Sequence, residues 1–275
     1  MSGDIGTIGD STDNTQNLVT IGSGVKDNFI HGFIFTKAYD SGILIDGTNS
    51  NINCCVFTNT YGRGINILNG NNVKINASVF FKIIGVAGVG VYIETGCLDV
   101  IITNSVFAEN TMTFGGSIYS ENNNAIYSNC TIVNNICKDG NPAGIFNWNN
   151  PTDRVMSCII YNNRNSKGRE YAQLTYGYYV SYSDIEDKDS NGIYSITGDT
   201  INLIDGSPVF EYQKDSVNLY PAGADGIWYT IDDGLRLQSV SPCREKGNFY
   251  SDFDILGRTR PNENYPDIGA YEYYQ

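Results

Sequence analysis

Carboxylates supply most of the side chains in this sequence that could do chemistry. The single histidine, His31, excludes metal sites that need several histidines. None of the seven cysteines forms a pair at the C-x-x-C spacing of a zinc site or a redox motif. No local motif marks a serine or cysteine nucleophile. Enzymatic chemistry would therefore depend on Asp, Glu, Lys, Arg or Tyr.

Two glutamates form the one candidate catalytic pair. Glu94 and Glu121 are 27 residues apart, the length of one unit of the repeat described below. Equivalent residues of successive units would bring their backbones to about 5 Å, and retaining glycosidases hold their two carboxyl groups roughly 5 to 5.5 Å apart. Any two stacked, outward-facing glutamates share this spacing, so the alternative is a pair of ordinary surface carboxylates.

A second carboxylate group surrounds Gly226. Asp225, Asp232 and Asp233 form an acidic loop with the oxygen ligands that calcium prefers. Their spacing differs from the twelve-residue EF-hand loop, and solvated turn carboxylates are the alternative. We expect no cofactor, unless this loop binds calcium. Asp254 and Arg258, four residues apart, are expected to form a structural ion pair in a turn.

Composition limits the partners. Seventeen basic and 30 acidic residues give a formal net charge of -13, which repels nucleic acid and anionic lipid. No apolar run approaches the roughly 18 residues of a membrane span, and the first ten residues lack the features of a signal peptide. Abundant Gly (30) and Tyr (20) with 17% charged residues indicate a folded, turn-rich chain.

The elements that position these carboxylates follow from an internal repeat. A small or sulfur-bearing residue recurs every 23 to 28 residues. These marker residues are Gly32, Cys55, Ser78, Ser105, Cys130, Cys158 and Ser183. Two places after each marker stand Ile34, Phe57, Phe80, Phe107, Ile132, Ile160 and Ile185. Three places before it stand Phe29, Ile52, Ile75, Ile102, Tyr127, Val155 and Val180.

These residues are β-branched or aromatic, which suits strands whose side chains stack on the next coil about 4.8 Å away. The change from odd to even spacing requires a bend, placed just before the marker at His31, Asn104 and Asn129. The pattern predicts an all-β, right-handed parallel β-helix with three short strands per coil of about 25 residues. A leucine-rich repeat has an overlapping period, but neither column contains leucine.

The coils are predicted for residues 1–186. After Glu186 the period fades and most prolines occur, so residues 187–275 are expected to contain the last strands and an irregular C-terminal cap that covers the end of the stack. Cys55, Cys130 and Cys158 are expected as small core residues. The disulfide status of Cys54, Cys97, Cys137 and Cys243 stays open.

A third strand per coil follows a glycine and carries the surface of interest. Alternation points Leu44, Asn66, Tyr92, Tyr119 and Phe146 outward, followed two places later by Asp46, Leu68, Glu94, Glu121 and Trp148. Exposed rings stack on sugar faces and carboxylates accept hydroxyl hydrogens, so Tyr92, Tyr119, Phe146, Trp148 and Asp46 form a candidate glycan-binding strip. The alternative is that loops, Thr111 to Gly115 or Lys138 to Ala143, fold over these rings.

The coils resemble the right-handed β-helix proteins of the pectate-lyase-like superfamily. The chain end resembles bacterial surface proteins described as choice-of-anchor Q domain proteins, on three matching segments. These are Ser241 to Cys243 with Gly247, then Asp254 to Pro261, then Asp267 to Glu272. The resemblance implies the C-terminal part of a longer secreted or cell-surface protein, with Met1 an added start, in a group without an agreed activity.

Pectate lyases of the superfamily use calcium-binding aspartates and an arginine base. The predicted outer faces here offer no arginine beside paired aspartates, so lyase chemistry is in doubt. Three function classes remain: an extracellular adhesion or glycan-binding protein, a lyase or glycoside hydrolase acting on polysaccharide, and a structural protein. The structural class follows from the predicted open strand edge of the N-terminal coil, which would allow end-to-end self-association.

Overall fold

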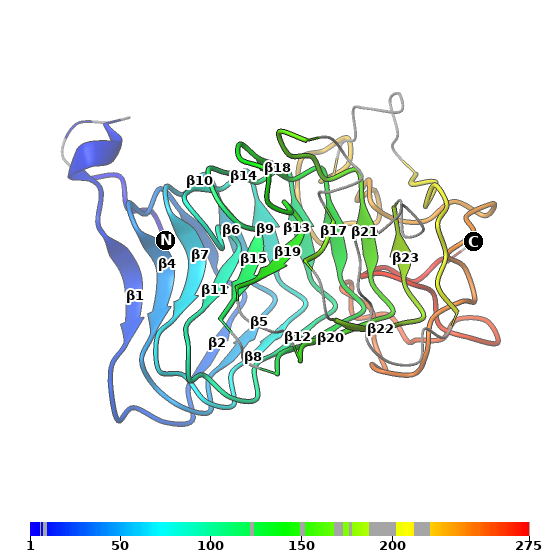
Figure 1. Ribbon diagram of the computed structural model, residues 1–275, viewed down its shortest axis with the longest axis horizontal. Coiled ribbons are helices and arrows are strands. Elements are labelled where there is room, and N and C mark those ends of the chain that lie inside the picture. Colours follow the sequence, from blue (N-terminus) through cyan, green and yellow to red (C-terminus); the bar gives the residue numbers. More distant parts are fainter. Residues whose placement is uncertain are drawn as a thin grey trace.

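A computed structural model describes residues 1–5, 7, 10–121, 124–148, 152–167, 173–175, 178–186, 202–211 and 221–274. The chain winds into a right-handed parallel β-helix whose coils advance steadily from the N-terminal end (Figure 1). The one helix in these residues is a 3-10 turn, η1 (Ser11–Asp13). No helix in the described part of the chain is long and apolar enough to span a membrane.

Three long parallel sheets form the walls. Sheet 1 contains β1 (Asn17–Ile21), β4 (Ser41–Ile45), β7 (Arg63–Ile67), β11 (Val91–Ile93), β15 (Ile118–Ser120) and β19 (Ile145–Asn147). Sheet 2 contains β2 (Phe29–His31), β5 (Asn51–Asn53), β8 (Lys74–Asn76), β12 (Ile101–Thr103), β16 (Ile126–Ser128), β20 (Arg154–Met156) and β22 (Tyr179–Ser181). Sheet 3 contains β3 (Ile34–Thr36), β6 (Val56–Thr58), β9 (Val79–Phe81), β13 (Val106–Ala108), β17 (Thr131–Val133), β21 (Ile159–Tyr161) and β23 (Asp184–Ile185).

A fourth, small sheet was not predicted. It contains β10 (Ile84–Gly85), β14 (Thr111–Met112) and β18 (Ile136–Cys137). Its strands lie in the connections between sheet 3 and sheet 1, where three successive coils are longer than the first two. The longer connections therefore form short strands of their own beside the three predicted per coil.

The predicted interior columns are confirmed from the second coil onward. Ile52, Ile75 and Ile102 pair in register on adjacent strands of sheet 2, and all three are fully buried. On sheet 3, the rings of Phe35, Phe57, Phe80 and Phe107 stack with centroids 4.5 to 4.9 Å apart and nearly parallel planes. Removing these side chains from water, coil after coil, is the main source of stability in such a repeat.

The predicted register is wrong by one residue in the first coil. Ile30 pairs with Ile52 and Phe35 with Phe57, whereas the expected column residues Phe29 and Ile34 are 69% and 58% exposed. The cause is the corner between sheets 2 and 3, which requires a positive φ. Gly32 takes that conformation at φ 75°. Phe33 therefore occupies the position of the marker Cys55, and His31 ends β2 instead of forming the bend.

The later corners have the same backbone. Cys54, Ala77, Asn104, Asn129, Ser157 and Tyr182 each have a φ between 46° and 51°. Asn104 and Asn129 thus form the bend as predicted, since asparagine tolerates this conformation better than most residues. The other corners hold residues for which the left-handed conformation is unfavourable.

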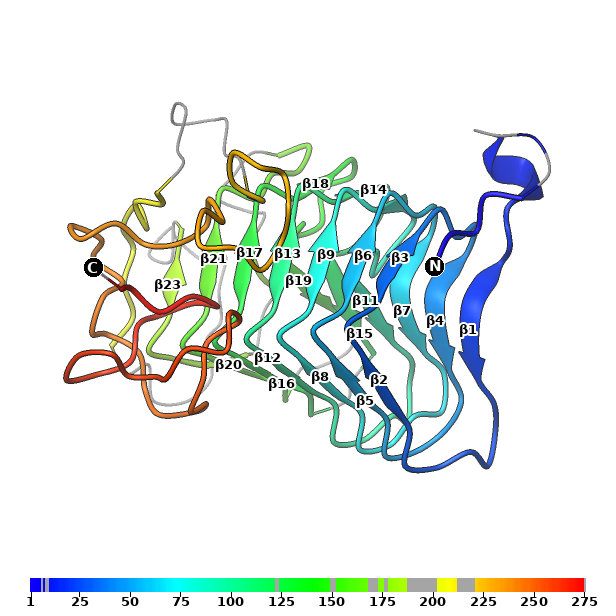
Figure 2. The ribbon, with the colours of Figure 1, turned by 180° about the vertical axis from the view of Figure 1, so that it is seen from behind.

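The C-terminal segment covers more than the end of the stack. Ile204 continues the stack past β23 through a parallel bridge with Asp184. Residues 221–274 then run back along the outer face of sheet 3, as Figure 2 shows in orange and red. There the buried side chains of Leu235, Ile255 and Tyr271 join a second core on the outer valines of that sheet.

The predicted ion pair of the C-terminal segment is present, and the pairing state of the cysteines is now defined. The Arg258 guanidinium lies 2.8 Å from Asp254 Oδ2, which confirms the expected ion pair in a turn. All seven cysteines are free thiols, and each is buried except Cys54, which is half-buried. The cysteines left open in the sequence, Cys97, Cys137 and Cys243 among them, are therefore unpaired.

Candidate functional site

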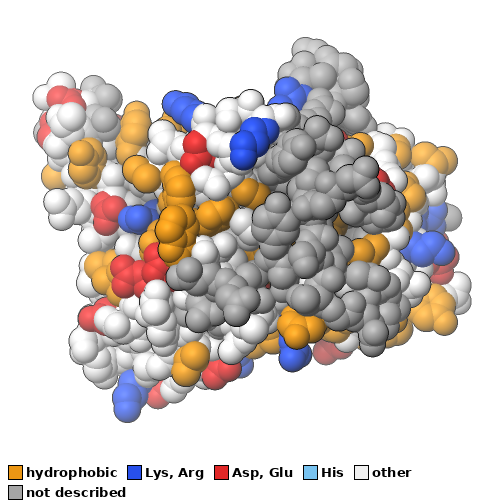
Figure 3. Space-filling model, in the orientation of Figure 1, with side chains coloured by type: hydrophobic (Ala, Val, Ile, Leu, Met, Phe, Trp, Pro, Cys, Tyr) orange, Lys and Arg blue, Asp and Glu red, His pale blue; other side chains and the backbone are white. Residues whose placement is uncertain are grey.

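The residues that directly follow the strands of sheet 1 form a column on the outer face, here called the outer column. Each donates its backbone N–H to the carbonyl of the preceding coil at 2.8 to 3.0 Å. Its members are Asp46, Leu68, Glu94, Glu121 and Trp148. The predicted alignment of Glu94 with Glu121 in successive coils is therefore present. Figure 3 shows acidic side chains beside hydrophobic ones on this face.

Glu121 is held by three hydrogen bonds. Tyr92 Oη donates to Glu121 Oε1 at 2.6 Å, and Thr95 donates to Oε2 through its N–H at 3.2 Å and its hydroxyl at 2.8 Å. Partial burial favours the neutral acid, but these hydrogen bonds outweigh it and lower the pKa of Glu121. Glu121 is therefore an ionised carboxylate in a fixed orientation.

Glu94 is shifted in the opposite direction. Partial burial, and after it the negative charge of Glu121, raise the pKa of Glu94, while the nearby Arg63 guanidinium opposes the rise. Two carboxylates whose surroundings separate their pKa values are the usual basis of acid and base roles. The pair thus has the electrostatic asymmetry that general acid–base catalysis requires, at half-exposed positions.

Tyr92 has both ring faces occupied. On one side its ring stacks on Tyr119, with centroids 4.8 Å apart and an interplanar angle of 3°. On the other side the Arg63 guanidinium lies 4.5 Å from the ring centroid, and Arg63 also contacts Asp40 Oδ1 at 3.4 Å. No face of this ring is free to stack on a sugar, so Tyr92 serves to orient Glu121.

Tyr119 and Phe146 are buried, contrary to the expectation of a row of solvent-facing rings. They are 5% and 6% exposed, and Phe114 packs against both with centroids 6.2 Å and 5.6 Å away. The alternative, in which the loop from Thr111 to Gly115 folds over the rings, therefore describes this part of the strip. Covering two apolar rings removes a large area from water, which favours the folded loop.

Trp148 is the predicted ring that stays open. It is 53% exposed, and its ring lies 5.7 Å from that of Phe114 and 6.2 Å from that of Phe146. Asp46, the other predicted strip residue, accepts a hydrogen bond from Asn69 Nδ2 at 2.7 Å and is separated from Glu94 by the Leu68 position. The structure thus places Trp148, Glu121 and Glu94 in three successive coils, and Asp46 lies two coils from Glu94.

The three aspartates predicted to hold calcium accept hydrogen bonds from the protein. Asp225 Oδ1 accepts the backbone N–H of Ile227 at 2.7 Å. Asp232 Oδ2 accepts the backbone N–H groups of Ala224 and Asp225 at 3.0 and 3.2 Å. Asp233 is buried and accepts from Tyr271 Oη at 3.0 Å. No group of three His, Cys, Asp or Glu side chains in the described ranges is arranged to hold a metal ion.

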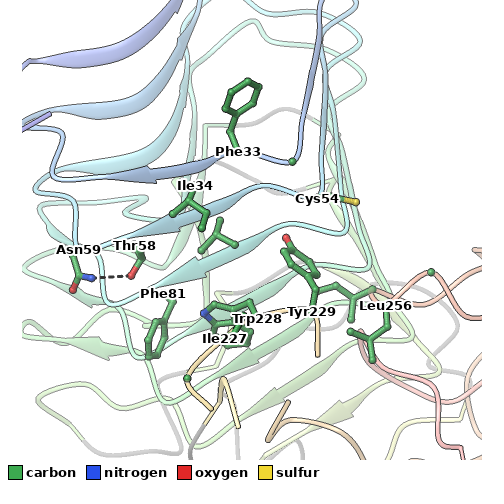
Figure 4. Close-up of a pocket in the computed structure, with 15 residues that line it drawn as sticks. Phe33, Ile34, Cys54, Thr58, Asn59, Phe81, Ile227, Trp228, Tyr229 and Leu256 are labelled. Atoms are coloured by element: carbon green, nitrogen blue, oxygen red, sulfur yellow. Dashed lines mark hydrogen bonds between the residues drawn. The ribbon is translucent and has the colours of Figure 1, made fainter. Parts of the chain in front are cut away.

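An apolar cavity of about 750 Å³ lies on the opposite flank and was not predicted (Figure 4). Its floor is the outer face of β3 and β6, with Ile34 and Val56, and its far wall is Ile227 to Tyr229 of the C-terminal segment. The sequence signal for this wall is the apolar run after Gly226, inside the loop that we interpreted by its carboxylates.

Comparisons with known proteins show similarity in the backbone path alone. No protein-family model matches the chain, and no curated protein sequence matches it. The solved structure of pectate lyase Pel9A is 11% identical, with a TM-score of 0.42, over 91% of this chain and 74% of that one. QnrB1, a plasmid-mediated fluoroquinolone resistance protein, is 8% identical, with a TM-score of 0.19, over 69% of this chain and 92% of that one. The strand pairing within the chain itself therefore identifies it as a parallel β-helix protein.

Proposed function

We propose that the chain binds carbohydrate through Trp148, Glu121 and Glu94 on the outer face of sheet 1, as an adhesion or glycan-contact protein. One observation carries the proposal. In three successive coils, the outer column places an exposed indole, then an ionised carboxylate held by three hydrogen bonds, then a second carboxylate. An indole face packs against the C–H face of a sugar ring, and carboxylates accept its hydroxyl hydrogens.

The geometry of the column supports an extended ligand. Successive coils lie about 4.8 Å apart, so the backbones of Trp148 and Glu94 are separated by roughly 10 Å. Glu121 needs no reorganisation to bind, because Tyr92 and Thr95 already hold it. A preorganised acceptor keeps more of its interaction energy as affinity than a freely rotating one.

The proposal includes presentation outside the cell. Its support is the resemblance of the segment from Asp267 to Glu272, and of the two segments before it, to bacterial surface proteins. The acidic composition supports glycan over nucleic acid as the partner, because a net charge of -13 repels phosphate.

A glycan array with purified protein tests the binding function. We expect the wild-type signal on at least one glycan class to fall at least tenfold in Trp148→Ala and in Glu121→Gln. Tyr179→Ala is the matched control, because Tyr179 is an exposed ring on sheet 2. Equal signals from the wild type and Trp148→Ala would remove this face as the binding site.

A second candidate function is glycoside hydrolysis at the same carboxylates. The specific observation is the opposite direction of the pKa shifts of Glu94 and Glu121. In this hypothesis Glu94 is the general acid and Glu121 the ionised partner. Incubation with pectin, alginate and host glycans, followed by assays for reducing ends and unsaturated products, tests it. Activity that persists in Glu94→Gln would contradict these roles.

A third candidate is end-to-end assembly. β1 and β2 stand at the first edge of their sheets, whereas the outer edge of β3 is paired with Met1 to Gly3 through a parallel bridge from Ser2 to Thr36. The unpaired strand edge at this end of the stack therefore includes β1 and β2 but not β3, and it is smaller than the sequence predicts. Light scattering across a hundredfold range of concentration tests assembly, and a constant monomer mass would reject it.

A further inference from the structure

The apolar cavity between sheet 3 and the C-terminal segment has walls from three separate parts of the chain. Phe33, Ile34 and Val56 come from the first two coils, Phe81 from β9, and Ile227 and Trp228 from the loop that crosses them. In Figure 4, Ile34 and Tyr229 lie between the ring of Phe33 on one side and the rings of Phe81 and Trp228 on the other. A volume of about 750 Å³ is within the range of roughly 300 to 1,000 Å³ typical of small-molecule sites.

The chemistry of the lining is almost entirely apolar. None of the described residues that line the cavity carries a charge. Thr58 and Asn59 supply polar side chains at one end, where Asn59 Nδ2 donates to Thr58 Oγ1 at 3.1 Å. A charged ligand would lose its hydration there without a partner, so the cavity selects against ions.

The far wall is held in place by specific bonds. Tyr229 has a φ of 68°, an unfavourable conformation for a tyrosine. Its hydroxyl contacts the carbonyl oxygens of Cys55 and Ala77, and its N–H donates to Asp233 Oδ2 at 3.1 Å. Trp228 packs edge-on against Phe81 with centroids 5.3 Å apart. The hydrogen bonds of Tyr229 and the ring contact of Trp228 therefore fix the far wall of the cavity to the coils.

A peptide that adds a strand to a sheet edge is a poor occupant. Such recognition needs an unpaired edge beside the groove. The outer edge of β3 is already paired with the first residues of the chain, since Gly3 N–H donates to Thr36 O and Thr36 N–H donates to Met1 O. The cavity offers side chains and glycine backbone as contacts, which suits a compact molecule.

We propose that this cavity is a binding site for an uncharged, mostly apolar small molecule, with one hydrogen-bonding group at Thr58 and Asn59. The match between a charge-free lining and an uncharged ligand is the basis of this assignment. The site lies on the opposite flank from the outer column and is independent of the proposed glycan binding.

The probe for the test is N-phenyl-1-naphthylamine, a neutral fluorescent molecule of suitable size. We expect one saturable site per chain and energy transfer from Trp228, which lines the cavity. Trp228→Phe should remove most of the energy transfer. Trp148→Phe should leave the transfer in place, because Trp148 lies on the outer face of sheet 1. Transfer that depends on Trp148 alone would overturn the assignment.

Charge substitutions supply the second arm. Ile34→Glu and Ile227→Glu place a carboxylate in the lining at exposed positions, so folding should persist, as checked by circular dichroism. We expect each to weaken the Kd of the probe at least tenfold. Ile231→Glu, an exposed position outside the lining, is the matched control and should match the wild type. Unchanged affinity in both lining variants would overturn the proposal.

A second copy of the chain is the remaining alternative occupant of the cavity. Light scattering on the same samples as the probe titration distinguishes it from a small molecule. Probe binding that saturates while the mass stays monomeric supports the small-molecule site. Dimer formation that the probe reverses, and that Ile34→Glu abolishes, would instead assign the cavity to self-association and overturn the proposal.

Discussion

The hydroxyl oxygen of Tyr229 lies 3.0 Å from the carbonyl oxygen of Cys55, a residue 174 positions earlier in the chain. The carbonyl oxygen of Ala77, in the next coil, lies 2.9 Å from the same hydroxyl. One side chain of the C-terminal segment therefore joins two coils near the N-terminal end of the stack. This contact positions Trp228 and Ile227 as the wall of the apolar cavity.

Removal of this hydroxyl should loosen the C-terminal segment. We expect Tyr229→Phe to lower the free energy of unfolding by about 1 kcal/mol, because the phenyl ring stays while the hydrogen bonds are lost. Urea unfolding followed by circular dichroism measures the change. Tyr61→Phe, at an exposed tyrosine, is the control. An unfolding midpoint equal to that of the wild type would show that the tie is not stabilising.

A charge in the interior column should prevent folding. Ile102 is fully buried between Ile75 and Tyr127 of the adjacent coils. We expect Ile102→Asp to give no soluble folded protein, since an unpaired carboxylate would be buried. Ile102→Val should fold with a loss of about 1 kcal/mol. The soluble fraction and the far-ultraviolet spectrum distinguish the two, and a well-folded Ile102→Asp variant would contradict the role of this column.

Stability should fall as pH rises from about 4 to about 7. Burial raises the pKa of Asp233 to about 7 and of Asp184 to about 6, whereas unfolded aspartate titrates near 3.9. Between these values the folded chain binds more protons than the unfolded chain, so the free energy of unfolding decreases with pH. Each group contributes a slope of at most about 1.4 kcal/mol per pH unit.

Asp233→Asn isolates one of these contributions. The amide oxygen still accepts from Tyr271 Oη, but the side chain no longer titrates. We expect the free energy of unfolding of the variant, minus that of the wild type, to increase from pH 5 to pH 8. Urea titration at both pH values measures this difference. A constant difference between the two proteins across this range would rule out titration of Asp233.

The two outer glutamates should titrate as neighbours. We expect Glu121→Gln to lower the pKa of Glu94, by less than about one unit because both side chains are partly solvated. Carbon-13 NMR of the carboxyl groups measures the shift. Asp46→Asn is the control, because Asp46 is separated from Glu94 by the Leu68 position. An unchanged Glu94 titration would show that the carboxylates do not interact.

Thiol reactivity should identify a single accessible cysteine. Burial raises the pKa of Cys54, the one half-buried thiol, and the other cysteines are more deeply buried. We expect native protein to react slowly with a small disulfide reagent at Cys54 alone, and all seven thiols to react in urea. Cys54→Ser should abolish the native reaction. Because Cys54 lines the apolar cavity, N-phenyl-1-naphthylamine should slow its labelling.

The interior of the coils was predictable from spacing. Ile52, Ile75 and Ile102 recur once per coil, and each strand pairs with its equivalent in the next coil, so one period defines the whole column. The first coil was misplaced because we took Gly32 as the small marker residue and His31 as the bend before it. Only the backbone shows that the glycine takes the corner at a φ of 75°.

For the outer face of sheet 1, the sequence predicted only the direction in which the side chains point. Alternation along the strands correctly pointed Tyr92, Tyr119 and Phe146 outward. Their accessibility depended on Phe114, which reaches them from the connection between sheet 3 and sheet 1. Spacing along a strand carries no information about which connection folds over it, so Trp148 could not be singled out in advance.

The amino-acid sequence by itself determined the period, the interior columns and the alignment of Glu94 with Glu121, because neighbouring coils meet at a constant strand spacing. The tertiary structure alone decided where the C-terminal segment lies. Its contacts, such as Ala270 N–H to Thr131 Oγ1 at 3.0 Å, join residues 139 positions apart. No local spacing encodes such pairs, since the apolar outer face of sheet 3 exists only after the coils have stacked.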